Sequence, residues 1–260
     1  MKLKVYIANA FTDQSFGGNP AAIVPLKEWL SEPLMQEIAG QNNLSETAFI
    51  VPQGDAFAIR WFTPTVEVDL CGHATLAAAH IFFKHLDYTR DRIDFHSKSG
   101  LLGVSRQNSQ IVLDFPAKPP VKTSPDALIE KALGIKAPSI YTSAFDYMVV
   151  LDSSDQLEAL EPDFNLLKTH PSRGLIVTAK GDQTDFVSRC FYPQSGINED
   201  PVTGSAHVVM VPYWAGVTGK NKLSAMQLSQ RRGRLDCELV GDRVLISGQA
   251  VTYLEGDFNC

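Results

Sequence analysis

Short runs of apolar, β-branched and aromatic residues recur along the whole chain. Each run is bounded by Gly, Pro, Asp or Asn, which is the pattern of β-strands; examples are KVYIANAF, TAFIVP, FAIRWF, GLIVTA and FVSRCFY. Helical patterns are fewer. One is predicted from Ser31 toward Asn42, one from Ser124 to Gly134, and a short one over 155–160. The pattern therefore predicts a sheet-rich chain with few helices.

Two further helices are predicted over 74–84 and 206–216, and both are unusual. Their segments, TLAAAHIFF and HVVMVPYW, are apolar on nearly every side. A helix that is apolar all round is buried rather than laid on a surface. One buried helix among many strands in each half predicts a barrel-like sheet wrapped around a central helix.

The segments that lead into these two helices resemble each other. The first reads RWFTPTVEVDLCGHATLAAAH (60–80) and the second RCFYPQSGINEDPVTGSAHVV (189–209). Both begin Arg-x-Phe-x-Pro, pass acidic residues and reach Gly-x-Ala, about half a chain apart. A repeat at half the chain length predicts two structurally similar domains.

The proline-rich segment between the two halves is the expected linker. We place the N-terminal domain at 1–117, the linker at 118–125 and the C-terminal domain at 126–247. The last strand, 248–260, is expected to return to the first domain and complete it.

Composition excludes several classes of protein. The chain has 260 residues, 44% of them apolar, and a net charge of −6, with Lys and Arg scattered. A nucleic-acid partner is not expected, because such proteins present a basic face. No segment is long and apolar enough to span a membrane, and the N-terminus shows no signal-peptide pattern. The four cysteines form no CxxC pair or zinc spacing, so we expect free thiols, no metal and a cytoplasmic location.

The glycines that open the two buried helices suggest a binding function. The first turn of a helix exposes unpaired amides and a partial positive charge, and glycine allows close approach of a ligand. Gly72 and Gly204 can therefore each hold an anion such as a carboxylate. The alternative is ordinary capping, by Asp69 in the first copy and by Asp200 or Thr203 in the second. His73 and Ser205 occupy equivalent places, which favours the functional interpretation.

Four motifs together resemble the PhzF-like family of phenazine-biosynthesis-type isomerases, within the diaminopimelate-epimerase-like superfamily. They are FGGNPAAIV (16–24), NNLSETAFI (42–50), LCGHATLAAAH (70–80) and EDPVTGSAH (199–207), and the resemblance covers nearly the whole chain. Taken alone, the first motif is compatible with a plain turn and Glu46 in the second with a capping or solvated carboxylate. The segment Arg232-Gly-Arg234 departs from the glycine-richer pattern of the family.

The resemblance implies an α/β (α+β) fold of two pseudo-symmetric domains, each a mixed, barrel-like sheet around a central buried helix. It implies a cofactor-independent isomerase, active as a homodimer, with a small carboxylic acid bound in the cleft between the domains. The family's catalytic residues fall on Glu46, His73 and Asp200. Its serine falls on Ser205, and we expect Asn19, Cys71, Gly72, Thr203 and Gly204 to line the same site.

These identities suit a proton transfer. Moving a hydrogen next to a carbonyl or alkene needs one group that removes a proton and returns it at another carbon. A carboxylate in a dry pocket can do both, because burial brings its pKa toward neutrality. Glu46 would move the proton, Asp200 and His73 would orient or protonate the substrate, and Ser205 with the amides of Gly72 and Gly204 would hold its carboxylate.

Different mechanisms could use the same residues. Some superfamily members use two cysteines as opposed acid and base, but here Cys71 is matched by Thr203, whose hydroxyl is far too weak an acid. An epimerase that uses Cys71 with Glu46 or Asp200 opposite it is the main competing mechanism, since a helix start can lower a thiol pKa. A cysteine hydrolase built on Cys71 and a histidine is disfavoured, because His73 is only two residues away and no third orienting group is evident. A small-acid binding protein without turnover would also use His73, Asp200 and Ser205.

Overall fold

The computed structural model describes residues 1–136, 139–143 and 146–260, and the chain divides into two compact units. The first unit comprises Met1–Asp114 together with Ile246–Cys260, and the second comprises Phe115–Leu245. The described part of the chain contains no helix with the length and apolar character needed to cross a membrane.

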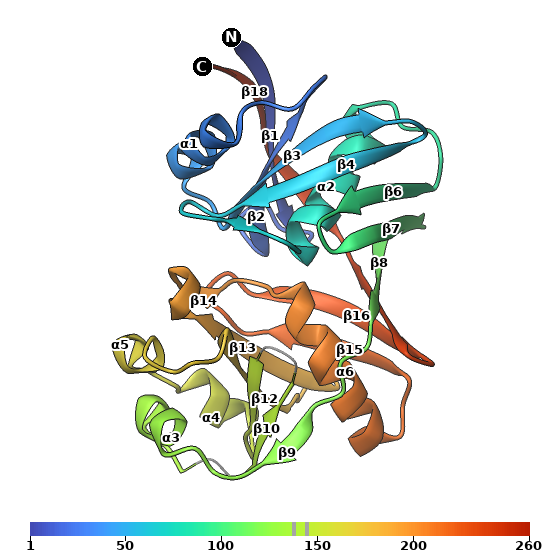
Figure 1. Ribbon diagram of the computed structural model, residues 1–260. Coiled ribbons are helices and arrows are strands. Elements are labelled where there is room, and N and C mark those ends of the chain that lie inside the picture. Colours follow the sequence, from blue (N-terminus) through green and yellow to red (C-terminus); the bar gives the residue numbers. More distant parts are fainter. Residues whose placement is uncertain (137–138, 144–145) are drawn as a thin grey trace. The chain divides into compact units, whose positions relative to one another are not determined.

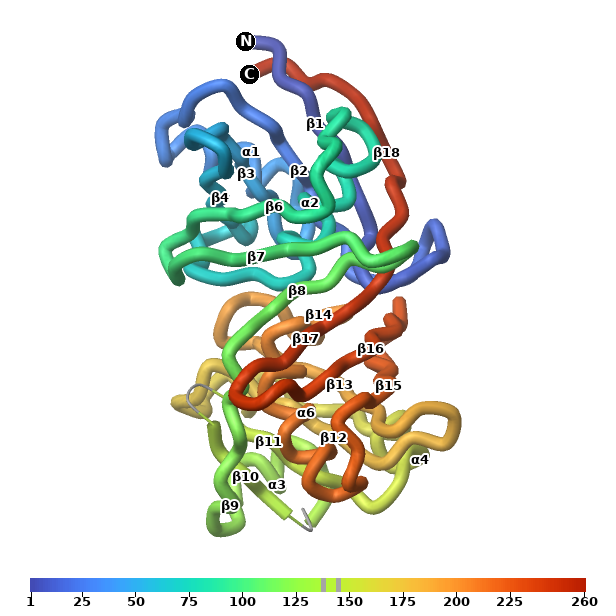
Figure 2. The backbone as a smooth tube through the Cα atoms, turned by 90° about the vertical axis from the view of Figure 1, so that its right-hand side faces the viewer, coloured from blue at the N-terminus to red at the C-terminus, as the bar shows by residue number. Residues whose placement is uncertain are grey.

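The first unit is a mixed sheet (Figure 1). Its strands are β1 (Lys2–Ala10), β2 (Asn19–Pro25), β3 (Glu46–Gln53), β4 (Ala56–Phe62), β5 (Glu67–Val68), β6 (Arg92–Ser97), β7 (Gly100–Gln107), β8 (Gln110–Pro116) and β18 (Ala250–Asn259). Parallel pairing joins β2 to β3 and β4 to β6, whereas β1–β2, β3–β4, β4–β5, β6–β7 and β7–β8 are antiparallel. The C-terminal strand β18 pairs antiparallel with β1 along nearly its whole length, and Figure 2 shows the two running side by side.

Helix α2 (Gly72–His85) is the buried helix of the first unit, and helix α1 (Glu32–Asn42) covers another part of the sheet. Ten of the 14 residues of α2 are buried, as its apolar sequence predicts. Helix α1 begins after Ser31 with a proline in its first turn and ends at Asn43, which adopts the left-handed conformation. Met35 and Ile38 on α1 pack against Phe49 and Phe62 of the sheet.

The second unit repeats this arrangement. Its strands are β9 (Val121–Thr123), β10 (Ser139–Thr142), β11 (Asp146–Val150), β12 (Gly174–Lys180), β13 (Phe186–Tyr192), β14 (Ile197–Asp200), β15 (Lys222–Gln227), β16 (Gly233–Val240) and the first half of β17 (Arg243–Gly248), whose residues from Ile246 on belong to the first unit. Parallel pairing joins β11 to β12 and β13 to β15, with antiparallel pairs β10–β11, β12–β13, β13–β14 and β15–β16. The segment predicted as a linker contains β9, which pairs antiparallel with β10.

The helices of the second unit are mostly short. They are α3 (Ala127–Leu133), α4 (Ser154–Glu158), α5 (Phe164–Leu167), the 3-10 turn η1 (Pro193–Ser195) and the long α6 (Gly204–Thr218). Asp126 caps α3 by accepting hydrogen bonds from Leu128 N and Ile129 N, and Gly134 ends it with φ of 66°. The sequence predicted α3 and α4 but not α5, whose single turn is too short to show a period.

The buried helix α6 contains a proline that the chain compensates locally. Pro212 has no N–H, so it cannot bond the carbonyl of Val208 one turn earlier. The backbone N–H of Lys118 donates to that carbonyl instead, at 2.9 Å. This contact replaces the hydrogen bond that the proline removes and lets α6 continue through it.

The repeat seen in the sequence is a repeat of interactions. Arg60 bonds Glu67 through Nε and Nη2, both at 2.7 Å, and Arg189 bonds Glu199 through the same nitrogens at 2.8 and 2.9 Å. In both copies the guanidinium also lies 5.2 Å from the ring of the phenylalanine two residues later. The motif Arg-x-Phe therefore joins β4 to β5 in one unit and β13 to β14 in the other.

Candidate active site

In the first unit, four predicted site residues lie together. Asn19 and Glu46 are the first residues of the adjacent parallel strands β2 and β3. Both side chains therefore lie at the same end of these strands. His73 lies in the first turn of α2, and Cys71 is the residue before that helix. All four residues are buried. The fold of this unit therefore gathers three separate sequence motifs into one buried cluster.

Asn19 is delivered to this cluster by a tight glycine turn. Gly18 has φ of 64°, and a Cβ at this position would lie 2.2 Å from the carbonyl oxygen of Ala10. Only glycine accommodates both the left-handed backbone and this close approach. The turn starts β2 with the Asn19 amide nitrogen 3.1 Å from His73 Nδ1.

His73 contacts both the thiol of Cys71 and the carboxylate of Glu46. Its Nδ1 is 3.5 Å from the sulfur of Cys71, and its Nε2 is 3.0 Å from Glu46 Oε2. The Nε2–Oε2 contact does not have the geometry of a hydrogen bond, and neither atom has a hydrogen-bond partner among the described residues. Both atoms are therefore buried, close together and able to bond a bound molecule.

The charge of His73 depends on burial and on the neighbouring carboxylate. Burial opposes a positive imidazole, but the negative charge of Glu46 favours it, and the pKa of His73 is raised well above its usual value. When the ring is neutral, the Asn19 amide can donate only to the lone pair of Nδ1. The remaining proton is then on Nε2 and faces Glu46.

The environment of Cys71 bears on the competing, cysteine-dependent mechanism. A helix start can lower a thiol pKa, yet burial, with the charge of Glu46 adding to it, raises the pKa of Cys71 to about 11. Burial dominates because the charged thiolate loses its hydration inside the protein. At neutral pH Cys71 is a thiol, which argues against its use as a base. All four cysteines are free, as predicted.

Glu46, Cys71 and His73 bring three potential metal ligands within 4.8 Å of one another. His73 contacts Cys71 through Nδ1 and Glu46 through Nε2, and one ion can bond only one of these two nitrogens. The expectation that no metal takes part stays a prediction.

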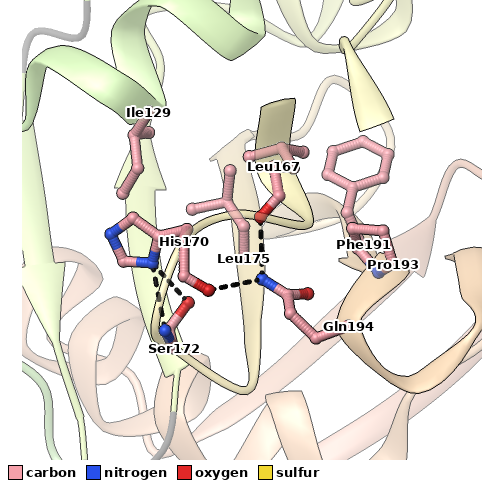
Figure 3. A pocket seen from close by; sticks show the side chains of 8 residues that line it. All are labelled: Ile129, Leu167, His170, Ser172, Leu175, Phe191, Pro193 and Gln194. Carbon is pink, nitrogen blue, oxygen red and sulfur yellow. Dashed lines mark hydrogen bonds between the residues drawn. The ribbon is translucent and has the colours of Figure 1, made fainter. Parts of the chain in front are cut away.

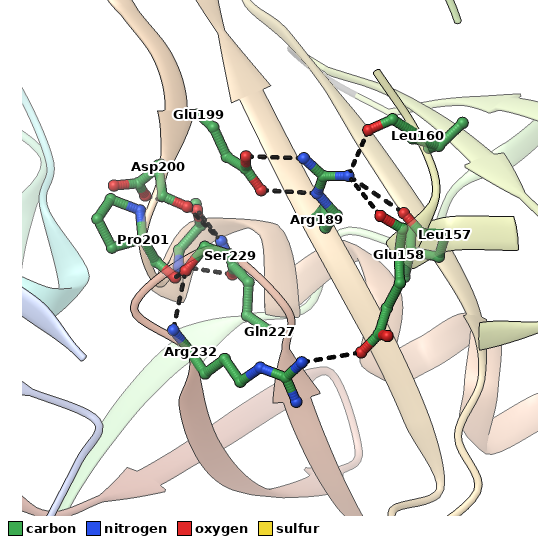
Figure 4. Close-up of polar contacts among 11 residues, drawn as sticks. Leu157, Glu158, Leu160, Arg189, Glu199, Asp200, Pro201, Gln227, Ser229 and Arg232 are labelled. Atoms are coloured by element: carbon green, nitrogen blue, oxygen red, sulfur yellow. Dashed lines mark hydrogen bonds and ion pairs between the residues drawn. The ribbon is translucent and has the colours of Figure 1, made fainter. Parts of the chain in front are cut away.

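In the second unit, Asp200 and Thr203 form the corresponding cluster. Asp200 ends β14, and its carboxylate points away from the neighbouring Glu199, as alternate residues of a strand do (Figure 4). Thr203 Oγ1 donates to Asp200 Oδ2 at 2.5 Å. Gly204 and Ser205 follow as the first two residues of α6. The second motif thus also forms one local cluster.

Gln227, which the sequence did not single out, fixes this loop. Its Oε1 accepts from Thr203 N at 2.8 Å, and its Nε2 donates to Asp200 O at 2.7 Å. Ser229 donates to the carbonyl of Pro201, so both sides of the loop are bonded (Figure 4). Gln227 stands at the end of β15 in a run without any motif, and no local signal marks it.

In the chain as described, the residues that precede the two buried helices do not cap them with their side chains. The residues before α2 and α6 are Cys71 and Thr203, and within the described residues neither makes a side-chain capping hydrogen bond. Asp69 is exposed and does not cap α2, and the Thr203 hydroxyl bonds Asp200 instead of a helix amide. Cys71 and Thr203 thus leave the first-turn amides of α2 and α6 without a side-chain cap from the N-cap position in the part of the structure described.

Comparison with known proteins identifies relatives over the whole chain. The family model described as phenazine biosynthesis-like protein, PhzC-PhzF, matches residues 8–256. An uncharacterized isomerase of Pseudomonas aeruginosa is 49% identical over 98% of both chains. The crystal structure of a PhzF-family phenazine biosynthesis protein of Enterococcus faecalis matches 100% of both chains with 44% identity and a TM-score of 0.97.

A more distantly related structure has the same fold. A predicted epimerase of Pseudomonas aeruginosa, 18% identical, matches 98% of this chain and 99% of its own with a TM-score of 0.77. At that identity the likeness shows the fold alone, which is the epimerase-like α/β fold that the sequence predicts. Together with the relatives over the whole chain, it confirms the resemblance carried by the four motifs: the chain belongs to the PhzF family of phenazine biosynthesis-like proteins and is an isomerase.

Proposed function

We propose that the protein is a cofactor-independent isomerase that moves a proton between two carbons of a small carboxylic acid. Glu46 would remove the proton and return it at the second carbon. The observation that carries this proposal is the buried pair of Glu46 Oε2 and His73 Nε2, 3.0 Å apart and without a hydrogen-bond partner in the described parts of the chain. Buried polar atoms in this state are unusual in proteins and suit a bound substrate.

The neighbours of Glu46 would assist the proton transfer. His73, with a raised pKa, supplies a proton or a hydrogen bond beside the carboxylate. An enolate-like charge that develops on the substrate is then stabilised by a donor that is already in place. Asp200 would orient the substrate or exchange a second proton, with its carboxylate held by Thr203.

The substrate carboxylate would bind at the helix starts. The first-turn amides around Gly72 and Gly204, together with Ser205, offer donors and a partial positive charge. The proposal requires one substrate to reach both clusters, which is the sequence-based expectation of a cleft between the domains. A homodimer and a cytoplasmic location likewise stay predictions.

Hydrogen exchange tests the proposal directly. We expect small unsaturated or hydroxylated carboxylic acids, incubated with the protein in deuterated water, to take up deuterium at carbon, as mass spectrometry and NMR would show. Glu46→Gln should lower the exchange rate by at least about 100-fold, the size of a lost general acid–base contribution. The exposed Glu28→Gln is the matched control and should exchange like the wild type.

Two results would redirect the assignment. If no acid of a broad panel exchanges but acids still bind, the protein is a binding protein. If exchange survives in Glu46→Gln and is lost in Cys71→Ala, the reaction is a cysteine-dependent epimerisation.

A further inference from the structure

Arg173 is a charged residue of the second unit that no motif marks. It directly precedes β12, and its Nε donates to Asp146 Oδ1 at 2.9 Å while its Nη2 donates to Asp146 Oδ2. Asp146 is only 2% exposed, whereas 40% of the Arg173 side chain is exposed. A two-point bond to a buried carboxylate fixes the plane of the guanidinium and leaves part of it at the surface.

The guanidinium lies at the start of helix α6. Arg173 Nη2 is 3.5 Å from the hydroxyl oxygen of Ser205, which is in the first turn of that helix. The ring of Tyr192 lies 5.5 Å from the guanidinium carbon. A positive side chain therefore stands next to a hydroxyl and the uncapped amides of a long helix.

The backbone that carries Arg173 is held on both sides. His170 Nδ1 lies 2.8 Å from Ser172 Oγ, which in turn donates to Gly174 O. Gln194 donates to the carbonyls of Leu167 and His170 (Figure 3). These bonds fix the segment just before β12 and hence the starting point of the Arg173 side chain.

Gly174 adds a steric requirement to this arrangement. A Cβ at Gly174 would lie 2.2 Å from the ring of Tyr192. Glycine at this position lets the aromatic ring pack against the strand beside the guanidinium. The same ring thus contacts both the backbone after Arg173 and the charged group itself.

The repeat shows what is special about this position. Glu46 begins β3 and Gly174 begins β12, and in each unit the residue three positions later pairs with the arginine of the Arg-x-Phe motif. His73 and Ser205 are each the second residue of the buried helix. Where the first unit places a carboxylate against that helix residue, the second unit places the guanidinium of the adjacent residue, Arg173.

We propose that Arg173, together with Ser205 and the first-turn amides of α6, binds the carboxylate of the substrate. The inference deepens the proposed function and rests on it for the nature of the substrate. Asp146 takes the N–H of Nε and one N–H of Nη2, so the substrate carboxylate would be bound by the other N–H donors of this planar, always charged group. The two units then have different tasks, proton transfer at Glu46 and anion binding at Arg173.

A matched pair of small molecules tests this. We would titrate the protein with 3-hydroxybenzoate and with its neutral analogue 3-hydroxybenzamide, followed by ligand-observed NMR at pH 7. The wild type should bind the acid more tightly than the amide. Arg173→Gln should weaken acid binding by about 10-fold or more, the range for hydrogen bonds to charged groups, and leave amide binding within about 2-fold.

Companion variants keep the test decisive if Arg173→Gln folds poorly, because that change leaves the buried Asp146 without its partner. The double variant Asp146→Asn/Arg173→Gln removes both charges and should show the same selective loss. Arg173→Lys retains the charge without the two-point geometry and should lose less. The exposed Arg234→Gln, in the same unit, is the control and should bind like the wild type.

The inference is wrong if the wild type shows no preference for the acid, if Arg173→Gln binds the acid normally, or if acid and amide weaken equally. The outcome is separable from the proposed function. Glu46→Gln should keep the Arg173-dependent acid preference while losing exchange. If the protein prefers the acid but exchanges no acid, the role of Arg173 is upheld and the proton transfer is refuted. If Arg173→Gln still exchanges with an unchanged KM, the proton transfer is upheld and the role of Arg173 is refuted.

Discussion

At the scale of single residues, the chemistry depends on how burial and neighbouring charge compete. His73 and Cys71 are two residues apart and both buried, yet their environments act differently on them. The pKa of His73 is raised despite burial, because the carboxylate of Glu46 favours its positive form. The pKa of Cys71 is raised by burial and by Glu46 together. The raised pKa values favour a protonated His73, which can donate a hydrogen bond, and a neutral Cys71 thiol.

The thiol of Cys71 should therefore be unreactive near neutral pH. A pKa of about 11 leaves little thiolate below pH 9, so alkylation by iodoacetamide should be roughly 100-fold slower than for an ordinary cysteine at pH 8. The rate should rise as pH approaches 11, provided that the fold persists. Peptide mapping by mass spectrometry measures this, with the exposed Cys260 as the internal reference. Rapid labelling of Cys71 at pH 7 would instead support the cysteine-dependent mechanism.

Sequence reasoning identified the residues of the motifs but not those that act on them from elsewhere. Glu46 and His73 were found because whole motifs resemble a family, and the structure brings them together with Asn19. Gln227 and Arg173 were missed because their roles arise from tertiary contacts with Thr203 and Ser205. A side chain that contacts a site from a segment far away in the chain produces no recognisable spacing in the sequence.

At the scale of elements, the two buried helices are the parts that the sequence predicted best. Their all-round apolar character required burial, and both are buried along most of their length. The capping that we considered as the alternative is absent at the two residues before these helices, Cys71 and Thr203, in the part of the chain that the structure describes. Instead, the side chains of Thr75 and His207, one turn into each helix, bond the carbonyls of Cys71 and Thr203.

His207 gives helix α6 a measurable pH dependence. The carbonyl of Thr203 only accepts, so the proton of the neutral ring is on Nδ1, and burial lowers the pKa of His207 to about 4. An unfolded histidine binds its proton near pH 6.5, so the unfolded state is protonated first as pH falls. The contribution of His207 is complete above about pH 6.5 and is lost as pH falls toward 4.

We therefore expect the free energy of unfolding of the wild type to fall by about 3 kcal/mol more than that of His207→Gln between pH 7 and pH 4. Denaturant unfolding at several pH values measures this difference. The exposed His96→Gln should retain the wild-type dependence. Equal slopes for the wild type and His207→Gln would contradict the assigned pKa.

At the scale of the whole molecule, the repeat determines the architecture. Each unit uses the same order of parallel and antiparallel pairs, with its buried helix inserted between the short strand and the next parallel strand. The Arg-x-Phe segments carried this information in the sequence. The strand pairings themselves could not be read from the sequence, because they join segments far apart in the chain, such as β1 and β18. The domain boundaries that we placed from composition stay predictions.

The pairing of β18 with β1 makes the first unit depend on the end of the chain. Thr252 on β18 also lies within hydrogen-bond distance of His80 and His85 on α2. Deleting residues 250–260 should expose the edge of β1 and increase amide exchange throughout β1 and α2. Deleting Cys260 alone is the control and should leave exchange nearly unchanged. Hydrogen–deuterium exchange with mass spectrometry would show this, and unchanged protection of β1 after the longer deletion would contradict the role of β18.

The central claim is that a buried glutamate, and not the neighbouring thiol, moves the proton. The most direct test compares carbon-bound deuterium incorporation into one exchanging acid by Glu46→Gln and by Cys71→Ala under identical conditions. The account predicts that Glu46→Gln loses at least about 100-fold in rate while Cys71→Ala stays within about 10-fold of the wild type. Normal exchange by Glu46→Gln together with its loss in Cys71→Ala would contradict the account.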